Sequence, residues 1–280
     1  MELTTKLKPF TKWTGGKRQL LDVLTVNMPE KYNTYYEPFI GGGALFFEVQ
    51  PENAIINDLN SDLILSYEVI KENVEELIEY LKEHDQNNSK EYYYHIRSAD
   101  RDGRYEEMND IEKAARLMYM LRVNFNGLYR VNSKGQFNTP YGKYKNPKIV
   151  DEELLYAIND YLNSNTITML NTSFETAVED ANEGDFIYLD PPYVPLSASS
   201  NFTAYTSEGF GYEEQVLLRD TFVELDNRGC YVMLSNSSAD LVYELYSDYE
   251  ETTIEVSATR MINSNAKKRG SIPELLIKNY

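Results

Sequence analysis

Residues 34–58 constrain the fold of this 280-residue chain more than any other stretch. They predict, in order, a short aromatic-rich strand over 34–39, a turn of three glycines, a helix over 44–49 and a second strand that ends at Asp58. A strand, glycine turn, helix and strand that ends in an acid is the usual start of an open α/β sheet. The carboxyl ends of such strands carry ligand sites. We therefore expect an α/β fold with a site near Gly41 and Asp58.

The remaining periodicity divides the chain into two α/β pieces and an insert. Leu63, Ile64, Tyr67 and Ile70 recur at helical spacing, and this spacing dominates from about 61 to 121. Alternation of strands and helices resumes after about 165. We predict a catalytic domain formed by residues 1–60 and 157–280, and an inserted domain over 61–156. The expected later elements are strands at 166–170, 186–189 and 229–234, helices at 174–182 and 213–227, and a terminal hairpin at 250–256 and 275–279.

The insert ends in a basic segment within an acidic chain. The net charge is −18 and the sequence pI is about 4.6, yet residues 122–150 contain no Asp or Glu. The aperiodic segment is rich in Asn, Gly, Tyr and Lys, and we predict a β-hairpin at about 122–145 with its tip at 132–135. A basic island of this kind either is a solvated loop or binds phosphate groups. Its basic residues are Arg122, Arg130, Lys134, Lys143, Lys145 and Lys148.

Composition excludes several classes of protein. Cys230 is the only cysteine, which leaves no intrachain disulfide and no cysteine-based zinc site. His84 and His95 are the only histidines and do not form an acid–His–nucleophile pattern. No apolar run reaches about 18 residues, and the first residues lack the apolar core of a signal peptide. These features predict a cytoplasmic protein.

Residues 189–193, Leu-Asp-Pro-Pro-Tyr, follow an apolar run and form the most informative motif for chemistry. Pro191 and Pro192 have no N–H group, and each restricts the preceding residue to extended geometry. The resulting stiff loop presents the Asp190 carboxylate and a backbone carbonyl as acceptors, with the flat ring of Tyr193 beside them. Two acceptors and a stacking surface suit the exocyclic amino group of a planar base, whereas the plainer alternative is a proline-rich turn.

A second set of motifs suits a nucleoside ligand. Glu37-Pro38-Phe39-Ile40-Gly41-Gly42-Gly43 is not Gly-x-Gly-x-x-Gly and lacks the Lys of a phosphate-binding loop, so a nucleoside without phosphates fits it best. Asp58 is placed to accept hydrogen bonds from ribose hydroxyls. Trp13 is the only tryptophan, and its position between Lys12 and Gly15-Gly16-Lys17 favours a ligand site over a core position. Because Lys17 can pair with a carboxylate, S-adenosylmethionine satisfies all these elements.

The motifs together resemble the Dam family of DNA adenine-N6 methyltransferases, of the α class and D12 type, and within it the modification methylases of the DpnM type. The resemblance covers about residues 8–279 and rests on Phe-x-Lys-Trp-x-Gly-Gly-Lys, Glu-Pro-Phe-x-Gly-Gly-Gly, Asn-Asp-x-Asn, Asp-Pro-Pro-Tyr and the segment 122–144. It implies a Rossmann-like S-adenosylmethionine-dependent methyltransferase sheet with an inserted helical target-recognition domain ending in the β-hairpin. It also implies direct methyl transfer to N6 of an adenine flipped out of double-stranded DNA.

The resemblance assigns roles to particular residues. Asp190, Pro191, Pro192 and Tyr193 are the catalytic set: Asp190 and the Pro191 carbonyl accept from the amino group, and Tyr193 stacks on the base. Ser173 stands where relatives commonly have Asp, which argues against a charged contact there. The implied cofactor residues are Phe10, Trp13, Gly16, Lys17, Glu37, Pro38, Phe39, Gly41, Gly43, Asp58, Phe174 and Asp190.

The implied DNA contacts lie mainly in the hairpin. Arg130 resembles the residue that reads guanine, Phe125 and Asn126 resemble the pair beside the opened base pair, and the site implied is GATC. Residue chemistry alone predicts only a guanine next to the target adenine. The remaining implied contacts are Leu128, Pro140 and Tyr144 to bases, Asn132 to the DNA, and Arg122, Lys134, Lys143 and Lys145 to phosphates. Phe202 and Tyr205 belong to a polar loop at 194–212, which either closes over the flipped base, as the resemblance implies, or is a disordered surface loop.

Other functions share parts of this pattern. Asp-Pro-Pro-Tyr also occurs in cytosine-N4 methyltransferases, and Asn-Pro-Pro-Tyr sites act on glutamine or RNA; Asp190 and the basic hairpin favour adenine in DNA. A DNA-binding regulator without activity would keep the fold but not need the intact motifs. Cys230 lies in a predicted buried strand, where it serves as a small apolar residue, and this excludes a C5-cytosine methyltransferase. The sequence leaves open a monomer or a weak dimer, and whether the enzyme accompanies a restriction nuclease.

Overall fold

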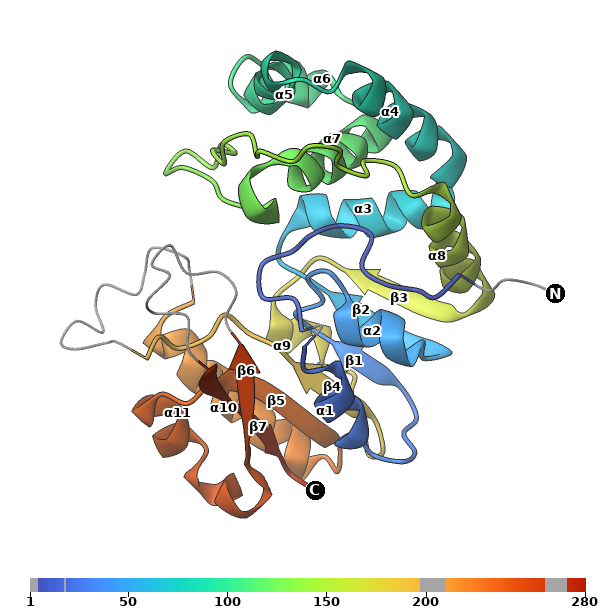
Figure 1. The fold of residues 1–280 in the computed structure, drawn as a ribbon. Helices are drawn as coiled ribbons and strands as arrows, with labels where there is room; N and C mark the ends of the chain where they lie inside the picture. Colours follow the sequence, from blue (N-terminus) through green and yellow to red (C-terminus); the bar gives the residue numbers. More distant parts are fainter. Residues whose placement is uncertain (1–4, 18, 197–209, 260–270) are drawn as a thin grey trace. The chain divides into compact units, whose positions relative to one another are not determined.

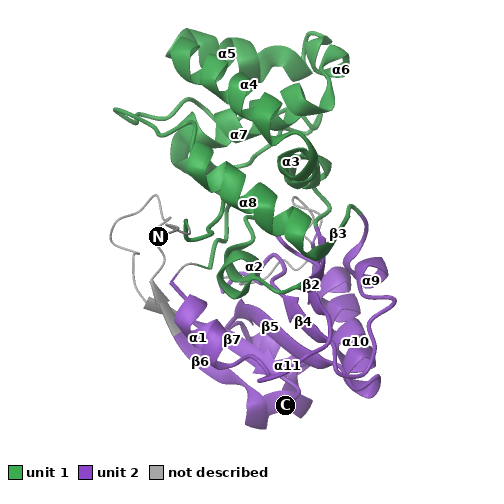
Figure 2. Ribbon diagram, turned by 90° about the vertical axis from the view of Figure 1, so that its right-hand side faces the viewer, with its two compact units in different colours: residues 1–17, 41–52, 58–171 green, residues 18–40, 53–57, 172–280 purple. Residues whose placement is uncertain are grey.

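The structure is a computed structural model that describes residues 5–17, 19–196, 210–259 and 271–280 (Figure 1). The chain forms two compact units (Figure 2). The first contains residues 1–17, 41–52 and 58–171, and the second contains residues 18–40, 53–57 and 172–280. The backbone therefore passes from the second unit to the first at residues 40–41 and 57–58, just after two strands end.

The second unit contains six of the seven strands of a mostly parallel sheet. Their order is β2-β1-β4-β5-β7-β6. The first four run parallel, with Tyr35 opposite Phe186 and Leu189 opposite Leu234, whereas β7 is antiparallel to both β5 and β6. This confirms the α/β fold predicted from the alternating pattern. The strands are β1 (Tyr35–Glu37), β2 (Asn53–Asn57), β4 (Phe186–Leu189), β5 (Tyr231–Ser237), β6 (Ile254–Thr259) and β7 (Ser271–Lys278).

Helices of the second unit pack on this sheet. They are α1 (Leu21–Val26), α9 (Phe174–Ala177), α10 (Tyr212–Asn227), α11 (Asp240–Leu245) and the 3₁₀ segment η4 (Ser247–Thr252). Leu218 and Phe222 of α10 join Ile187 and Val232 of the strands in one buried core. Because β4 is buried along its whole length, it reads as a continuous apolar run, as parallel strands do. This core fixes the position of the residues that follow β4.

The first unit contains the helices of the predicted insert, together with α2 (Ala44–Val49) and strand β3 (Thr166–Leu170). Helix α7 is almost entirely buried and runs between α3 on one side and α4 and α5 on the other (Figure 1). Its start is fixed by a capping box in which Asn109 and Glu112 bond each other's backbone. The helices are α3 (Ser61–Glu72), α4 (Val74–Asn87), α5 (Lys90–Arg97), α6 (Arg104–Glu107), α7 (Asp110–Val123) and α8 (Glu152–Ser164), with 3₁₀ turns η1 (Ser98–Asp100) and η2 (Phe125–Gly127).

Residues 122–145 form two antiparallel arms, held together by short bridges. The bridges join Asn124 to Tyr141 and Val131 to Phe137, and the arms end in the predicted turn at 132–135, where the Gly135 N–H donates to the Asn132 carbonyl at 2.9 Å. Pro140 has no N–H to donate, and the Thr139 hydroxyl donates instead to the Leu128 carbonyl at 2.7 Å. A side-chain hydrogen bond thus replaces a backbone one at this point and interrupts the ladder, so the segment is less regular than a continuous hairpin.

The helix predicted at 174–182 is shorter than expected and ends at Ala177. Just beyond this end, Arg228 Nη1 lies 2.9–3.3 Å from the carbonyls of Val178, Glu179 and Ala181. A side chain from a distant part of the sequence thus bonds the carbonyls of the turn that follows the helix. No helix in the described residues is long and apolar enough to cross a membrane.

Candidate active site

The loop that begins at Asp190 is held by side chains from neighbouring elements. It leaves the carboxyl end of β4, and the carbonyl of Pro192 accepts from Gln215 Nε2 at 3.0 Å. The Val194 N–H donates to Asn236 Oδ1 at 3.2 Å, and the Val194 carbonyl accepts from the Ser237 hydroxyl. In the described residues no donor contacts the Pro191 carbonyl. The loop is therefore anchored by its residues after Pro191.

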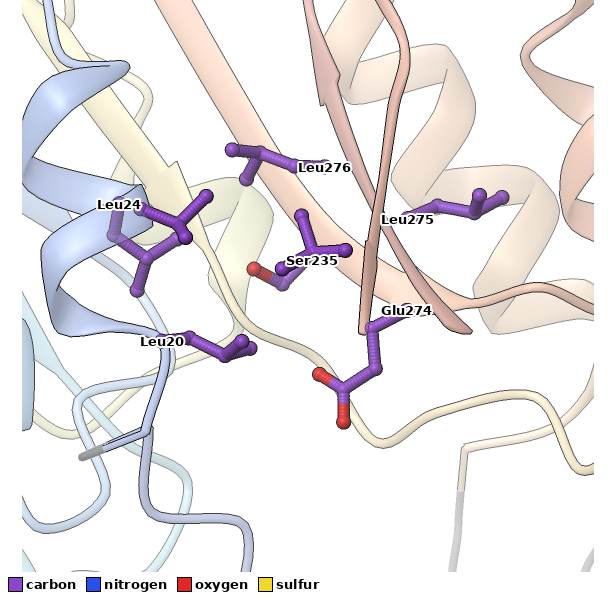
Figure 3. Close-up of a pocket in the computed structure, with 8 residues that line it drawn as sticks. Leu20, Leu24, Ser235, Glu274, Leu275 and Leu276 are labelled. Atoms are coloured by element: carbon purple, nitrogen blue, oxygen red, sulfur yellow. The ribbon is translucent and has the colours of Figure 1, made fainter. Parts of the chain in front are cut away.

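The ring of Tyr193 is also fixed. Its hydroxyl donates to Glu274 Oε2 at 2.9 Å, and burial, reinforced by Asp190, raises the pKa of Tyr193 well above its ordinary value. The phenol is therefore neutral and remains a donor to Glu274. Glu274 lines a cavity of about 10 Å³ with Leu20, Leu24 and Ser235 (Figure 3). That volume holds about one water molecule at most, so the cavity is not a ligand pocket.

Five residues of the predicted cofactor set belong to the second unit: Glu37, Pro38 and Phe39 at the end of β1, Phe174 at the start of α9, and Asp190 after β4. Phe39 packs against Phe174, with ring centroids 5.3 Å apart, and both contact Phe210. Glu37 is buried and accepts from the Tyr35 hydroxyl at 2.6 Å. Asn57 Nδ2 donates to the Pro38 carbonyl at 2.9 Å. Strand ends and aromatic packing thus fix the residues that lead into the glycine turn.

The glycine turn itself belongs to the first unit and leaves no room for side chains. Gly41 and Gly43 have φ of +49° and +69°, which only glycine adopts at no steric cost. A Cβ atom on Gly41 would lie 2.9 Å from Trp13 Cδ1, and one on Gly43 would lie 2.6 Å from the Tyr67 hydroxyl. That hydroxyl donates to the Gly41 carbonyl at 3.1 Å. The indole of Trp13 therefore packs directly on Gly41. On another side, its ring centroid lies 5.3 Å from that of Tyr129.

Asp58 organises the same turn. Its two carboxylate oxygens accept from the N–H groups of Gly41 at 3.1 Å and Asn60 at 2.9 Å. Burial raises the pKa of Asp58, and these two hydrogen bonds oppose that rise. An ionised carboxylate has about four acceptor positions, so capacity for ribose hydroxyls remains. Leu59 beside it is 70% exposed and offers an apolar face that sequence reasoning missed.

The other predicted cofactor residues in the first unit differ in exposure. Phe10 is buried and packs edge-on against Tyr67, and its carbonyl accepts from Arg122 at 2.7 Å. Gly16 is exposed, and Lys17 Nζ donates to the Gly15 carbonyl at 2.9 Å. Phe10 therefore acts through packing, whereas Lys17 has an ammonium group near the surface.

The predicted base-reading residues lie on exposed arms of the segment 122–145. Phe125 is 54% exposed, and Asn126 has φ of +60°. Arg130 is exposed, and its Nε donates to Asn138 Oδ1 at 2.6 Å. Its Nη2 also donates to the Asn138 carbonyl at 3.3 Å. Asn138 is a further residue that the sequence did not single out.

The predicted phosphate contacts are mostly accessible. Lys134, Lys143 and Lys145 are exposed, whereas Arg122 is half-buried. The ring of Tyr144 lies under Lys12 Nζ at 3.9 Å. Leu128 and Asn132 contribute backbone and side-chain acceptors within the arms, and Pro140 is exposed beside Phe125. Phe202 and Tyr205 lie outside the described residues.

The sequence did not predict the residues that hold the motif loop. Gln215 comes from α10, and Asn236 and Ser237 come from the end of β5. The one available indication was the polar run Ser235-Asn236-Ser237 that ends the apolar strand β5, because the parallel strands β4 and β5 end at the same edge of the sheet. Among the described residues no group of three or more His, Cys, Asp or Glu side chains is arranged to hold a metal ion.

The α/β sheet has an Asp-Pro-Pro-Tyr loop after β4 and, after β1, a glycine turn without the sequence of a phosphate-binding loop. This combination defines a methyltransferase. Residues 13–262 match the family described as D12 class N6 adenine-specific DNA methyltransferase, and the chain belongs to this family. It is 60% identical to the Type II methyltransferase M1.LlaDCHI of Lactococcus lactis subsp. cremoris, over 98% of this chain and 96% of that protein.

Two further relatives extend this similarity. The Type II methyltransferase M.MjaIII of Methanocaldococcus jannaschii is 39% identical over 98% of this chain and its own full length. The DNA adenine methylase of Escherichia coli (strain K12) is 34% identical over 97% of this chain and 95% of its own length. The chain is thus an adenine-specific DNA methyltransferase that methylates N6, and the family implies S-adenosylmethionine as methyl donor.

Proposed function

We propose that this enzyme methylates the adenine of GATC in double-stranded DNA after rotating that base out of the duplex. The observation that supports this most strongly is the anchored loop after β4, which presents Asp190, the Pro191 carbonyl and the neutral Tyr193 phenol from one short segment. Inside a duplex one N6 hydrogen is bonded to thymine and the ring faces are stacked, so a loop that accepts both hydrogens and stacks a tyrosine on the ring requires the base to leave the stack.

In this proposal the loop acts on the amino group directly. Asp190 and the Pro191 carbonyl accept one N6 hydrogen each, which keeps lone-pair density on nitrogen and aims it at the methyl carbon. Pro192 stiffens the loop, and Tyr193 stacks on the adenine ring. S-adenosylmethionine supplies the methyl group as a sulfonium. Because the methylated nitrogen must then lose a proton, the Asp190 carboxylate is the acceptor already bonded to it.

The residues around the glycine turn suit the cofactor. Asp58 retains acceptor capacity for ribose hydroxyls, Lys17 can pair with the carboxylate of the amino-acid portion, and the exposed Leu59 offers an apolar surface for adenine. Trp13 packs so close to Gly41 that a Cβ atom there would collide with its indole. We assign the same role to the remaining predicted cofactor residues, Phe10, Gly16, Glu37, Pro38, Phe39, Gly41, Gly43 and Phe174, with S-adenosylhomocysteine as the product.

The helical insert and its basic arms are proposed to recognise the DNA. The exposed Arg130 guanidinium suits the O6 and N7 acceptors of guanine, and the exposed Phe125 suits the space that a flipped base leaves. Lysines such as Lys134 and Lys143 are then phosphate contacts, which position the protein without reading sequence. Because the rest of the chain is acidic, DNA should bind only at this basic segment.

The test uses purified protein, methyl-labelled S-adenosylmethionine and two unmethylated duplexes that differ only in GATC against a scrambled site. N6-methyladenine in the GATC duplex alone is expected after digestion to nucleosides. Label in both duplexes would contradict the assignment of the basic arms. A third duplex carries 2-aminopurine at the target position, and its fluorescence should rise on binding. Unchanged fluorescence there, together with normal transfer, would contradict base flipping.

A further inference from the structure

Gln215 and Asn236 form a continuous hydrogen-bond chain that ends on the backbone of the motif loop. Gln215 Nε2 donates to the Pro192 carbonyl at 3.0 Å, and Gln215 Oε1 accepts from Asn236 Nδ2 at 3.2 Å. Asn236 Oδ1 in turn accepts the N–H groups of Val194 at 3.2 Å and Ser237 at 2.8 Å. Gln215 is 3% exposed and Asn236 is fully buried, so water does not replace these contacts.

The direction of every bond in this chain is dictated by backbone groups. Two N–H groups, which can only donate, face Asn236, so its oxygen must point at them and its NH₂ group at Gln215. The Gln215 oxygen must then face Asn236, and its NH₂ group is left to meet the Pro192 carbonyl, which can only accept. Both amide orientations therefore follow from the network.

The Pro192 carbonyl is the group whose fixation matters for the reaction. Both prolines hold φ near −65°, and the loop starts from Leu189, which is paired in the sheet. The main freedom left between Asp190 and Tyr193 is rotation about ψ at the two prolines. Because Gln215 fixes the carbonyl of Pro192, it limits that rotation and so limits where the Pro191 carbonyl points.

We infer that Gln215, oriented by Asn236, is a positioning residue that sets the direction of the Pro191 carbonyl and thereby the rate of methyl transfer. The inference rests on the role proposed above for Asp190 and Pro191. Misplacement of a reacting group by about 1 Å can cost roughly 100-fold in rate. Substrate and cofactor binding depend on other residues and should change much less.

Three variants test this. Gln215→Met keeps volume and removes both amide bonds, and Gln215→Glu keeps shape but puts an ionised oxygen against the Pro192 carbonyl. The matched control is Thr221→Val on the same helix, because Thr221 is buried but bonds only the Leu217 carbonyl of α10. The readout is the single-turnover rate with saturating cofactor and DNA, beside S-adenosylhomocysteine affinity and thermal unfolding.

We expect Gln215→Met to lower the single-turnover rate roughly 10- to 100-fold with cofactor affinity kept, and Thr221→Val to stay near wild type. The carboxyl group introduced by Gln215→Glu can donate to the Pro192 carbonyl once it is protonated, so the rate of this variant relative to wild type should rise as pH falls. The ratio removes the contributions of Asp190, Glu214 and Glu274, which both proteins carry. A purely structural Gln215 would give no such pH-dependent recovery.

The positioning role of Gln215 and the proposed role of the Asp190 loop give different outcomes. If Asp190→Ala transfers methyl groups at the wild-type rate, the proposed role of the loop is wrong. If Asp190→Ala is inactive but Gln215→Met equals wild type, or the Gln215→Glu ratio is flat with pH, only the positioning role of Gln215 is overturned. If Gln215→Met fails to fold, the Gln215→Glu profile decides alone.

Discussion

Replacement of Gly41 by alanine tests whether the packing of Trp13 on the glycine turn serves cofactor binding. Gly41 has φ of +49°, where an L-residue costs about 1 kcal/mol. The new Cβ atom would lie 2.9 Å from Trp13 Cδ1, whereas carbon atoms pack at about 3.5 Å or more. The indole must therefore move by about 0.6 Å and lose part of its contact with Tyr129.

The size of the effect follows from that contact. An aromatic pair such as Trp13 and Tyr129, 5.3 Å apart between centroids, contributes about 0.5–1.5 kcal/mol. In the proposed site the cofactor needs Trp13 in its present position, so restoring that position costs the bound state about 1 kcal/mol, which corresponds to roughly a fivefold weaker affinity. We expect isothermal titration with S-adenosylhomocysteine to show this loss for Gly41→Ala, together with a lower melting temperature.

Gly103 supplies the matched control. It has φ of +85°, and a Cβ atom there would meet nothing within 4 Å. Gly103→Ala therefore carries the backbone cost without the collision, so it should be destabilised similarly while binding S-adenosylhomocysteine normally. Unchanged affinity in Gly41→Ala, or an equal loss of affinity in both variants, would refute the reasoning.

Three further results are expected. Arg130→Ala should reduce discrimination at one guanine by about 1–3 kcal/mol, whereas Lys134→Ala should weaken binding to all duplexes alike, in competition assays with single-base variants of GATC. Affinity for DNA should fall steeply with added salt despite the net charge of −18, and a flat salt titration would contradict a basic footprint. Burial lowers the pKa of His84 to about 4. The unfolded chain binds that proton below about pH 6.5, so the free energy of unfolding should be full above that pH and fall by up to about 3 kcal/mol towards pH 4. His84→Phe should lose this part of the pH dependence in denaturant titrations.

The sequence predicted the elements whose signal is local. The helix at 44–49 and the strands at 166–170 and 186–189 have the predicted bounds, because each is an apolar run ended by polar residues or glycine. The exposure of Lys134, Lys143 and Lys145 also follows from their acid-free, aperiodic segment. The roles of the predicted site residues stay predictions.

Features that depend on distant side chains escaped sequence reasoning. Arg228, some 50 residues later, bonds the carbonyls of the turn that follows helix α9. Gln215 and Asn236 look like ordinary helix and strand residues until the sheet aligns the ends of β4 and β5. Side-chain bonds to backbone of this kind have no period or spacing, so only the tertiary structure reveals them.

The place of β7 between β5 and β6 has a consequence for synthesis on the ribosome. Residues 231–237 and 254–259 are both translated before residues 271–278, yet the last of these strands separates the other two in the sheet. A nascent chain that has just produced β6 therefore has no native neighbour for it, and its backbone groups stay unpaired until β7 emerges. Such a waiting strand is a site for wrong pairing with other chains. Premature termination between residues 259 and 271 would thus leave a product prone to aggregate, rather than a shortened enzyme.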